Sequence, residues 1–202
     1  MAPVLIPRAR LSRWLENFEN GHGRVLLSVT DGHLAGRAED GSTFTAEPPF
    51  STKVAEPAAE ALEASAAPPD DWGILLVRKG GFAVARMAGE QVVESKVGQR
   101  HVQGRTKAGG QSQQRFARRR DNQARAAYEA AADHAARIVA PVPVMVVGGD
   151  HAAVTAVLAD DRLKRAAEVV RGPFLTVPDP RRGVLETAIR DACSVRITVS
   201  NA

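Results

Sequence analysis

Several residue types are scarce in this sequence, and each shortage excludes a class of protein. Cys193 is the only cysteine among 202 residues, so an intrachain disulfide and a cysteine-built zinc ribbon are both excluded. Aromatic residues make up only 4%, so a core must consist largely of Val, Leu, Ile and Ala. No apolar run reaches the roughly 20 residues that a membrane helix needs, and early prolines and charges argue against a signal peptide. We therefore expect a cytoplasmic protein with no membrane partner.

Positive charge is only modestly in excess, but it is concentrated in one segment. The chain has 27 Lys and Arg against 23 Asp and Glu, a formal net charge of +4. Residues 100–125 contain eight of the basic residues and a single acid, Asp121, so the rest of the chain is slightly negative. Clustered basic residues are typical of proteins that bind a phosphate backbone. The sequence therefore predicts a nucleic-acid contact within residues 100–125.

Hydrophobic patterning predicts two parts of the chain that meet near residue 70. Before that point, the pattern predicts a helix over 8–20, a strand over 24–29, weaker strands within 33–46 and a helix within 54–65. Residues 66–71, with two prolines and two aspartates, form the expected boundary. We expect residues 1–70 to be an N-terminal extension packed on a domain formed by residues 71–202. One continuous domain over residues 1–202 is the alternative.

The second part has the pattern of an α/β protein. Strands over 72–78, 82–87 and 91–97, joined by tight turns, predict an antiparallel meander. A polar loop follows, and then a helix from about Ser112 to Val139 with an alanine-rich apolar stripe. Further strands over 141–147, 174–177 and 195–199 alternate with helices, one of them N-capped by Asp150. The predicted fold is therefore a mixed β-sheet with flanking helices, one of which is a long helix after the loop.

A Gly109-Gly110-Gln111 tip joins the polar loop to the basic part of this long helix. Glycines allow positive φ and a close approach of the backbone to other groups. A primary amide offers two donors and one acceptor and does not titrate. A flexible tip that carries a glutamine beside clustered arginines fits chemistry performed inside an RNA site. For the tripeptide alone, a simple turn before an exposed glutamine is the alternative.

The extended run resembles the catalytic middle domain of eukaryotic and archaeal peptide-chain release factors. The resemblance is carried by Gly-Gly-Gln-Ser at 109–112, by Arg115-Phe116-Ala117-Arg118 and by the long helix, and it covers roughly residues 72–200. From the length of 202 residues we expect neither the codon-reading domain nor the partner-binding domain of those proteins. It is therefore similar to the Vms-like release factors, in a bacterial, actinobacterial-type branch. Ala108 departs from the pattern, because the family more often has a further glycine there.

The resemblance implies a ribonuclease-H-like architecture for the catalytic domain. It also implies codon-independent hydrolysis of peptidyl-tRNA, which frees nascent chains from stalled ribosomes or large subunits in ribosome-associated quality control. Catalysis is assigned to Gly109, Gly110 and Gln111, with the Gln111 backbone N–H stabilising developing charge and its side chain orienting water. The implied partners are the peptidyl-transferase centre of the large subunit, peptidyl-tRNA and ribosomal RNA. We expect a monomer that needs no metal or other cofactor.

The basic segment supplies the residues expected to contact RNA. A guanidinium group can donate two parallel hydrogen bonds to phosphate oxygens. Positions 115, 118 and 119 share one helix face because they are three and four residues apart. A solvated helix face is the alternative for the charge run alone. The candidate RNA-binding residues are Arg105, Lys107, Arg115, Arg118, Arg119 and Arg120.

Two other functions stay open at this point. A non-catalytic ribosome-binding rescue factor would share the fold and the arginines but would not need Gln111. A nuclease of ribonuclease-H-like architecture would need clustered carboxylates at strand ends, and the sequence contains no convincing set. The adjacent pairs Asp70-Asp71 and Asp160-Asp161 are typical of solvated turns, His101 is a polar-loop residue, and Cys193 is expected on a helix in the core.

Overall fold

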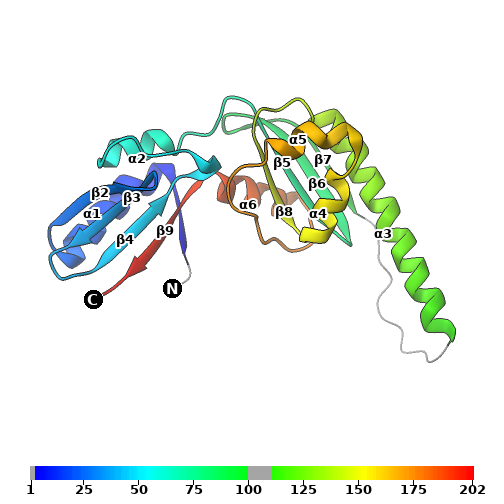
Figure 1. Ribbon diagram of the computed structural model, residues 1–202, viewed down its shortest axis with the longest axis horizontal. Helices are drawn as coiled ribbons and strands as arrows, with labels where there is room; N and C mark the ends of the chain where they lie inside the picture. The colour runs from blue at the N-terminus through cyan, green and yellow to red at the C-terminus, as the bar shows by residue number, and fades with distance from the viewer. Residues whose placement is uncertain (1–2, 100–110) are drawn as a thin grey trace. The chain divides into compact units, whose positions relative to one another are not determined.

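The computed structural model describes residues 3–99 and 111–202, with side chains for residues 3–98 and 125–202. Four of the predicted site residues, Arg105, Lys107, Gly109 and Gly110, lie outside the described residues. The chain divides into two compact units (Figure 1). The first comprises Met1–Pro68 together with Ile189–Ala202, and the second comprises Pro69–Ala188.

The first unit is built on a five-stranded antiparallel sheet with the strand order β1-β9-β4-β3-β2. Its strands are β1 (Val4–Pro7), β2 (Val25–Thr30), β3 (His33–Ala38), β4 (Thr43–Glu47) and β9 (Ser194–Ser200). One face of the sheet is covered and the other is open, as antiparallel sheets commonly are. On β4, for example, Phe44 and Ala46 are buried while Thr45 between them is exposed.

Two helices accompany this sheet, α1 (Leu11–His22) after a 3₁₀ turn at Arg8–Arg10, and α2 (Ala59–Ser65) after a 3₁₀ turn at Pro49–Ser51. Leu11 and Phe18 of α1 are buried in one core with Phe44. The rings of Trp14 and Phe18 stack at 5.5 Å, and both meet the Phe44 ring edge-on at 5.1 Å. The chain has few aromatic residues, and three of them pack α1 against the sheet.

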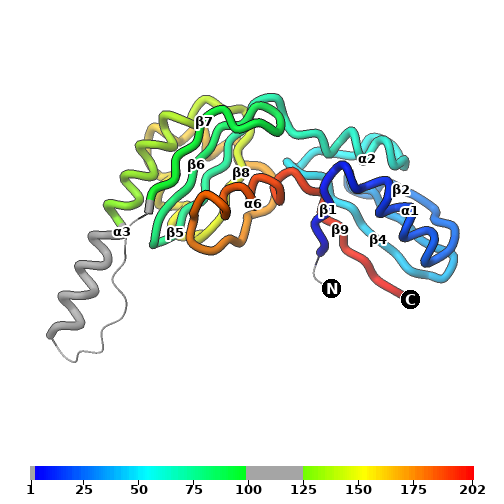
Figure 2. The backbone as a smooth tube through the Cα atoms, turned by 180° about the vertical axis from the view of Figure 1, so that it is seen from behind, coloured from blue at the N-terminus to red at the C-terminus, as the bar shows by residue number. Residues whose placement is uncertain are grey.

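The second unit contains a four-stranded mixed sheet in the order β7-β6-β5-β8, seen in Figure 2 from the side away from α4. Its strands are β5 (Trp72–Arg78), β6 (Gly81–Ala88), β7 (Gln91–Gln99) and β8 (Met145–Gly149). The first three pair antiparallel, and β8 pairs parallel to β5. Because β5 is buried at six consecutive positions, its sequence is a continuous apolar run rather than an alternating one.

The helices of the second unit are α3 (Gln111–Ile138), α4 (His151–Leu158) and α5 (Lys164–Glu168), with a 3₁₀ turn at Asp161–Leu163. Helix α6 (Arg182–Ala192) begins in this unit, and its last four residues belong to the first. Helices α3, α4 and α5 share one hydrophobic core with Leu75 and Val84 of the sheet. The predicted cap is confirmed, since an Asp150 side-chain oxygen accepts from the Ala153 N–H at 3.2 Å. The α/β fold class with a mixed sheet and a long helix is also confirmed.

The structure differs from the sequence-based expectation in where the last strand lies. Strand β9 was expected in the sheet of the second domain, yet it pairs with β4 and β1 of the first unit, with Ala46 opposite Ile197 and Ile6 opposite Val195. Val195 and Ile197 are fully buried in the core of that unit. In this position β9 pairs with a strand on each side and buries Val195 and Ile197 in one core with Leu11 and Phe44.

Two other local expectations were wrong. Residues 174–177 form no strand and make only a single parallel bridge, between Leu175 and Gly148. Strand β8 begins at Met145 rather than near residue 141, because prolines at 141 and 143 cannot donate to a ladder. Among the described residues, no helix combines the length and apolar character needed to cross a membrane.

Candidate functional site

Helix α3 carries the predicted site residues that the structure describes. Gln111 is its first residue, and the helix follows the edge strand β7 through residues 100–110. The first turn of any α-helix leaves backbone N–H groups without intrahelical partners and is the positive end of the helix dipole. Anions therefore bind favourably at such an end. The first turn of α3, which starts at Gln111, therefore has the polarity that favours a nearby anion.

The C-terminal half of α3 is anchored on the sheet by small side chains. Ala127, Ala131, Ala135 and Ile138 are buried at three- and four-residue spacing. The last three lie in one core with Phe82 of β6. Alanine is the best helix former, and its small side chain lets a helix axis lie close to a sheet. The alanine-rich stripe predicted from the sequence is therefore the packing face, and it fixes the helix that begins at Gln111.

Charge is segregated along α3. The exposed acids and arginine of its C-terminal half are mostly paired with other elements, since Asp133 lies 2.8 Å from an Arg162 nitrogen and Arg137 forms an ion pair with Glu94. Residues 111–125 have a different composition, with five arginines against the single acid Asp121. The net positive charge of the helix is thus confined to the part nearest Gln111.

Helical spacing orders these arginines relative to the packing face. With 3.6 residues per turn, positions 115, 118 and 119 fall on the side opposite to the buried stripe through Ala131. Position 120 falls in register with that stripe instead. Three of the four candidate arginines of α3 therefore share one side of the helix.

A small groove lies where α3 passes the β6–β7 hairpin. It has a volume of about 190 Å³, and the His134 ring stacks on Phe82 inside it at 5.6 Å. Lys96, on the last part of β7 before residues 100–110, also lines it. Sequence reasoning did not single out Lys96 or His134. In the sequence, Lys96 is only a basic residue within a predicted strand. It becomes a candidate only when the structure shows that it lines a groove with α3.

The other sequence candidates have structural partners. Asp71 receives two hydrogen bonds of 2.9 Å from the Arg86 guanidinium, which raises the pKa of Arg86. Asp160 accepts from the Arg162 side chain at 2.8 and 2.9 Å and from its backbone N–H at 3.0 Å. The Arg162 side-chain hydrogen bonds, followed by the backbone one, lower the pKa of Asp160 to about 2. Each of these acids thus stabilises a local turn or strand end.

The remaining candidates give no second site. Cys193 is half-buried in the turn after α6 and lies outside the helix in which it was expected. Arg78, at the end of β5, donates to the Val177 carbonyl at 2.7 Å and lies 3.5 Å from Asp179. Within the described part of the chain, no three His, Cys, Asp or Glu residues gather closely enough to hold a metal. The carboxylate cluster that a nuclease needs is therefore missing from those residues.

Comparison with known proteins settles the family. A family model described as acVLRF1, the Actinobacteria/chloroflexi VLRF1 release factor, matches residues 70–198, more than half of the chain. The chain belongs to this release-factor family. The resemblance to Vms-like release factors is thereby confirmed. The matched range of this VLRF1 family member covers the second unit and continues through most of β9 in the first.

Two solved structures are similar to this chain at low sequence identity. One is the crystal structure of the archaeal translation termination factor aRF1, with a TM-score of 0.43 and 13% identity over 94% of this chain and 63% of that chain. The other is Pelota of Archaeoglobus fulgidus, with a TM-score of 0.32 and 12% identity over 94% of this chain and 61% of that chain. The chain thus spans less than two thirds of either relative. A sequence comparison with curated proteins found no match.

Proposed function

We propose that this VLRF1 family member is a codon-independent peptidyl-tRNA hydrolase that releases nascent chains from stalled ribosomes or large subunits. The observation that carries the proposal is the position of Gln111, directly after Gly109-Gly110 and at the first residue of a long helix, in a chain of a release-factor family. In the reaction, water attacks the ester carbonyl that joins the nascent chain to the terminal ribose. The ester C–O bond breaks, and the ribose oxygen leaves as a hydroxyl.

The protein's share of this chemistry is positioning and charge stabilisation. The unpaired N–H groups at the start of α3, including that of Gln111, face an anionic oxygen favourably. The Gln111 amide orients the water, and Gly109 and Gly110 let the backbone approach the ester closely. No protein nucleophile is required, because the surrounding RNA and the substrate hydroxyl supply the remaining polar groups.

The arginines of α3 place this tip by binding RNA. Arg115, Arg118 and Arg119 share the helix side opposite to the packing face, so the helix can lie on phosphates without leaving the sheet. Arg105, Lys107 and Arg120 belong to the same basic segment of the sequence, and Lys96 lines the groove between α3 and the β6–β7 hairpin. The proposed binding partners are ribosomal RNA of the peptidyl-transferase centre and peptidyl-tRNA.

The test is release of a labelled nascent peptide from purified stalled ribosomal complexes, with wild type compared to Gln111→Ala. We expect release to slow by about 10²–10³, the usual cost of losing a positioned polar group at a site of developing charge. Co-sedimentation with ribosomes should be unchanged. Gln123→Ala, on the same helix, is the matched control and should release peptide at the wild-type rate.

Full activity of the Gln111→Ala protein would refute the catalytic assignment. If the wild type binds ribosomes but releases no peptide, the alternative of a non-catalytic rescue factor is correct. A zinc-selective chelator should leave release unaffected, and loss of activity that added zinc restores would contradict the metal-free mechanism.

A further inference from the structure

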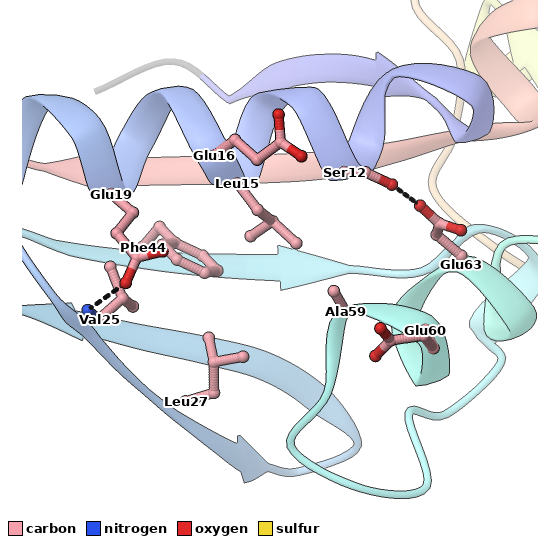
Figure 3. Close-up of a pocket in the computed structure, with 10 residues that line it drawn as sticks. All are labelled: Ser12, Leu15, Glu16, Glu19, Val25, Leu27, Phe44, Ala59, Glu60 and Glu63. Carbon is pink, nitrogen blue, oxygen red and sulfur yellow. Dashed lines mark hydrogen bonds between the residues drawn. The ribbon is translucent and has the colours of Figure 1, made fainter.

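The first unit contains an acidic pocket that the proposed hydrolysis does not use. The pocket has a volume of about 320 Å³ and lies between α1, α2, β2 and β4 (Figure 3). Ligand clefts usually begin at about 300 Å³, so it suits one or two side chains rather than a large cofactor. Its floor is apolar and its rim acidic. The lining residues are Ser12, Leu15, Glu16, Glu19, Val25, Leu27, Phe44, Ala59, Glu60 and Glu63.

The rim brings four glutamates together from two helices. Glu16 and Glu19 lie on the side of α1 that also carries Leu15, and Glu60 and Glu63 lie one turn apart on α2. Glu19 accepts from the Val25 N–H at 3.4 Å, and Glu63 accepts from the Ser12 hydroxyl. In the described part of the chain, none of these four carboxylates forms an ion pair. The neighbouring Arg8 side chain donates to the backbone carbonyl of Glu63 rather than to the Glu63 carboxylate.

The charges of the two units identify the kind of partner. Of the 27 Lys and Arg in the chain, 8 belong to the first unit and 19 to the second, and of the 23 Asp and Glu, 10 and 13 do so. The first unit is therefore net negative while the second is strongly positive. A negative rim repels RNA phosphates, so this pocket does not extend the proposed RNA-binding surface. Carboxylates above an apolar floor complement a basic side chain, whose aliphatic stem packs on the floor while its cationic head reaches the rim.

We propose that the pocket of the first unit docks a basic, partly apolar segment of a protein partner. A lysine or arginine of that segment enters between α1 and α2, and an adjacent apolar side chain packs against Leu15, Leu27 and Phe44. The family match begins at residue 70, so α1 and α2 lie outside the matched range. The docking site is thus a recruitment feature separate from the catalytic tip.

The test uses the full chain, at 0.15 M salt, and fluorescence anisotropy of a short labelled peptide of lysine and leucine. A pocket variant changes the four rim glutamates to glutamine, which keeps their acceptors for Ser12 and Val25. A control variant neutralises four acids of the same unit outside the pocket. These control changes are Asp31→Asn, Glu39→Gln, Glu47→Gln and Glu56→Gln.

We expect the pocket variant to bind the peptide about tenfold more weakly, because it removes all four carboxylates that face the basic side chains of the peptide and each exposed charge pair contributes only modestly. The control variant should lose less than about threefold, since screening limits charges that do not touch the peptide. Ala59→Phe, which fills the pocket without changing its charge, should also weaken binding. Thermal unfolding and ribosome co-sedimentation serve as checks that each variant is folded.

Three results would overturn the proposal. Equal losses in the pocket and control variants would mean non-specific attraction to net charge. An oligolysine peptide that binds as tightly as the lysine–leucine peptide would leave the apolar floor without a role. Spermidine that displaces the peptide at a lower concentration than the unlabelled peptide itself would make the pocket a polyamine site. None of these results depends on peptide release, so the proposal and the proposed hydrolysis fail separately.

Discussion

Charge reversal on α3 gives the most direct test of the proposed RNA binding. The perturbation is Arg115→Glu, Arg118→Glu and Arg119→Glu combined. Helical spacing puts these three positions on the side opposite to Ala131, Ala135 and Ile138, which are buried in one core with the sheet. The substitutions therefore leave the packing face of the helix intact, and the fold should survive them.

The expected loss follows from the number of phosphate contacts. Each contact to single-stranded nucleic acid contributes about 0.7 to the slope of log K against log salt, so three lost contacts lower the slope by about 2. The electrostatic part of binding vanishes near 1 M salt. At 0.15 M, three contacts correspond to roughly 50-fold in affinity, and the reversed charges add repulsion to that loss.

The assay is co-sedimentation with vacant large ribosomal subunits over a series of salt concentrations. A matched control reverses three exposed arginines elsewhere in the second unit, Arg165, Arg181 and Arg182, and changes net charge by the same amount. We expect the control to keep nearly the wild-type slope. If the α3 variant also keeps that slope at every salt concentration, the arginines form a solvated helix face and the RNA contacts lie elsewhere.

Three further predictions concern stability, each measured by urea unfolding. Leu75→Ala should cost about 2–5 kcal/mol because Leu75 is fully buried in the core under α3, whereas Leu26→Ala, at a 70% exposed position, should cost less than about 0.5 kcal/mol. Gly149→Ala should cost at least about 1–3 kcal/mol, since φ is +108° and a Cβ would lie 2.2 Å from a backbone oxygen of β5; a neutral result would refute the close approach. Asp160→Asn should be less stable than wild type at neutral pH, and this difference in stability should shrink as pH falls from about 4 towards 2. The reason is that the pKa of Asp160 is lowered to about 2 in the folded protein, so its carboxylate stabilises the fold fully only above its pKa in the unfolded chain. A deficit that does not change across that range would contradict the ion pair.

Local sequence patterns were sufficient wherever the structure depends on near neighbours. The β5–β6–β7 meander follows from apolar runs separated by tight turns, and β5 has the predicted bounds Trp72–Arg78. Helix α3 begins one residue before the predicted Ser112 and ends one before Val139. Its alanine stripe and the Asp150 cap are also local signals, because each involves residues within about one or two helical turns.

The candidate catalytic residues were likewise found from the sequence alone. Gly109, Gly110 and Gln111 are adjacent in the chain, and the arginines after them belong to one helix, so a linear motif contains the whole set. The structure adds that a helix starts at Gln111 and that its second half is fixed on the sheet by Ala131 and its neighbours. Whether the tip hydrolyses peptidyl-tRNA stays a prediction.

Tertiary structure alone decided the contacts between distant segments. Strand β9 pairs with β1 and β4, about 150 to 190 residues away, and its apolar face would suit either sheet, so local patterning does not choose between them. The acidic pocket has the same origin, because its lining residues come from four separate elements, α1, β2, β4 and α2. Such a site becomes visible only after packing, since burial of apolar faces chooses which strands and helices meet, and that choice depends on the whole chain at once.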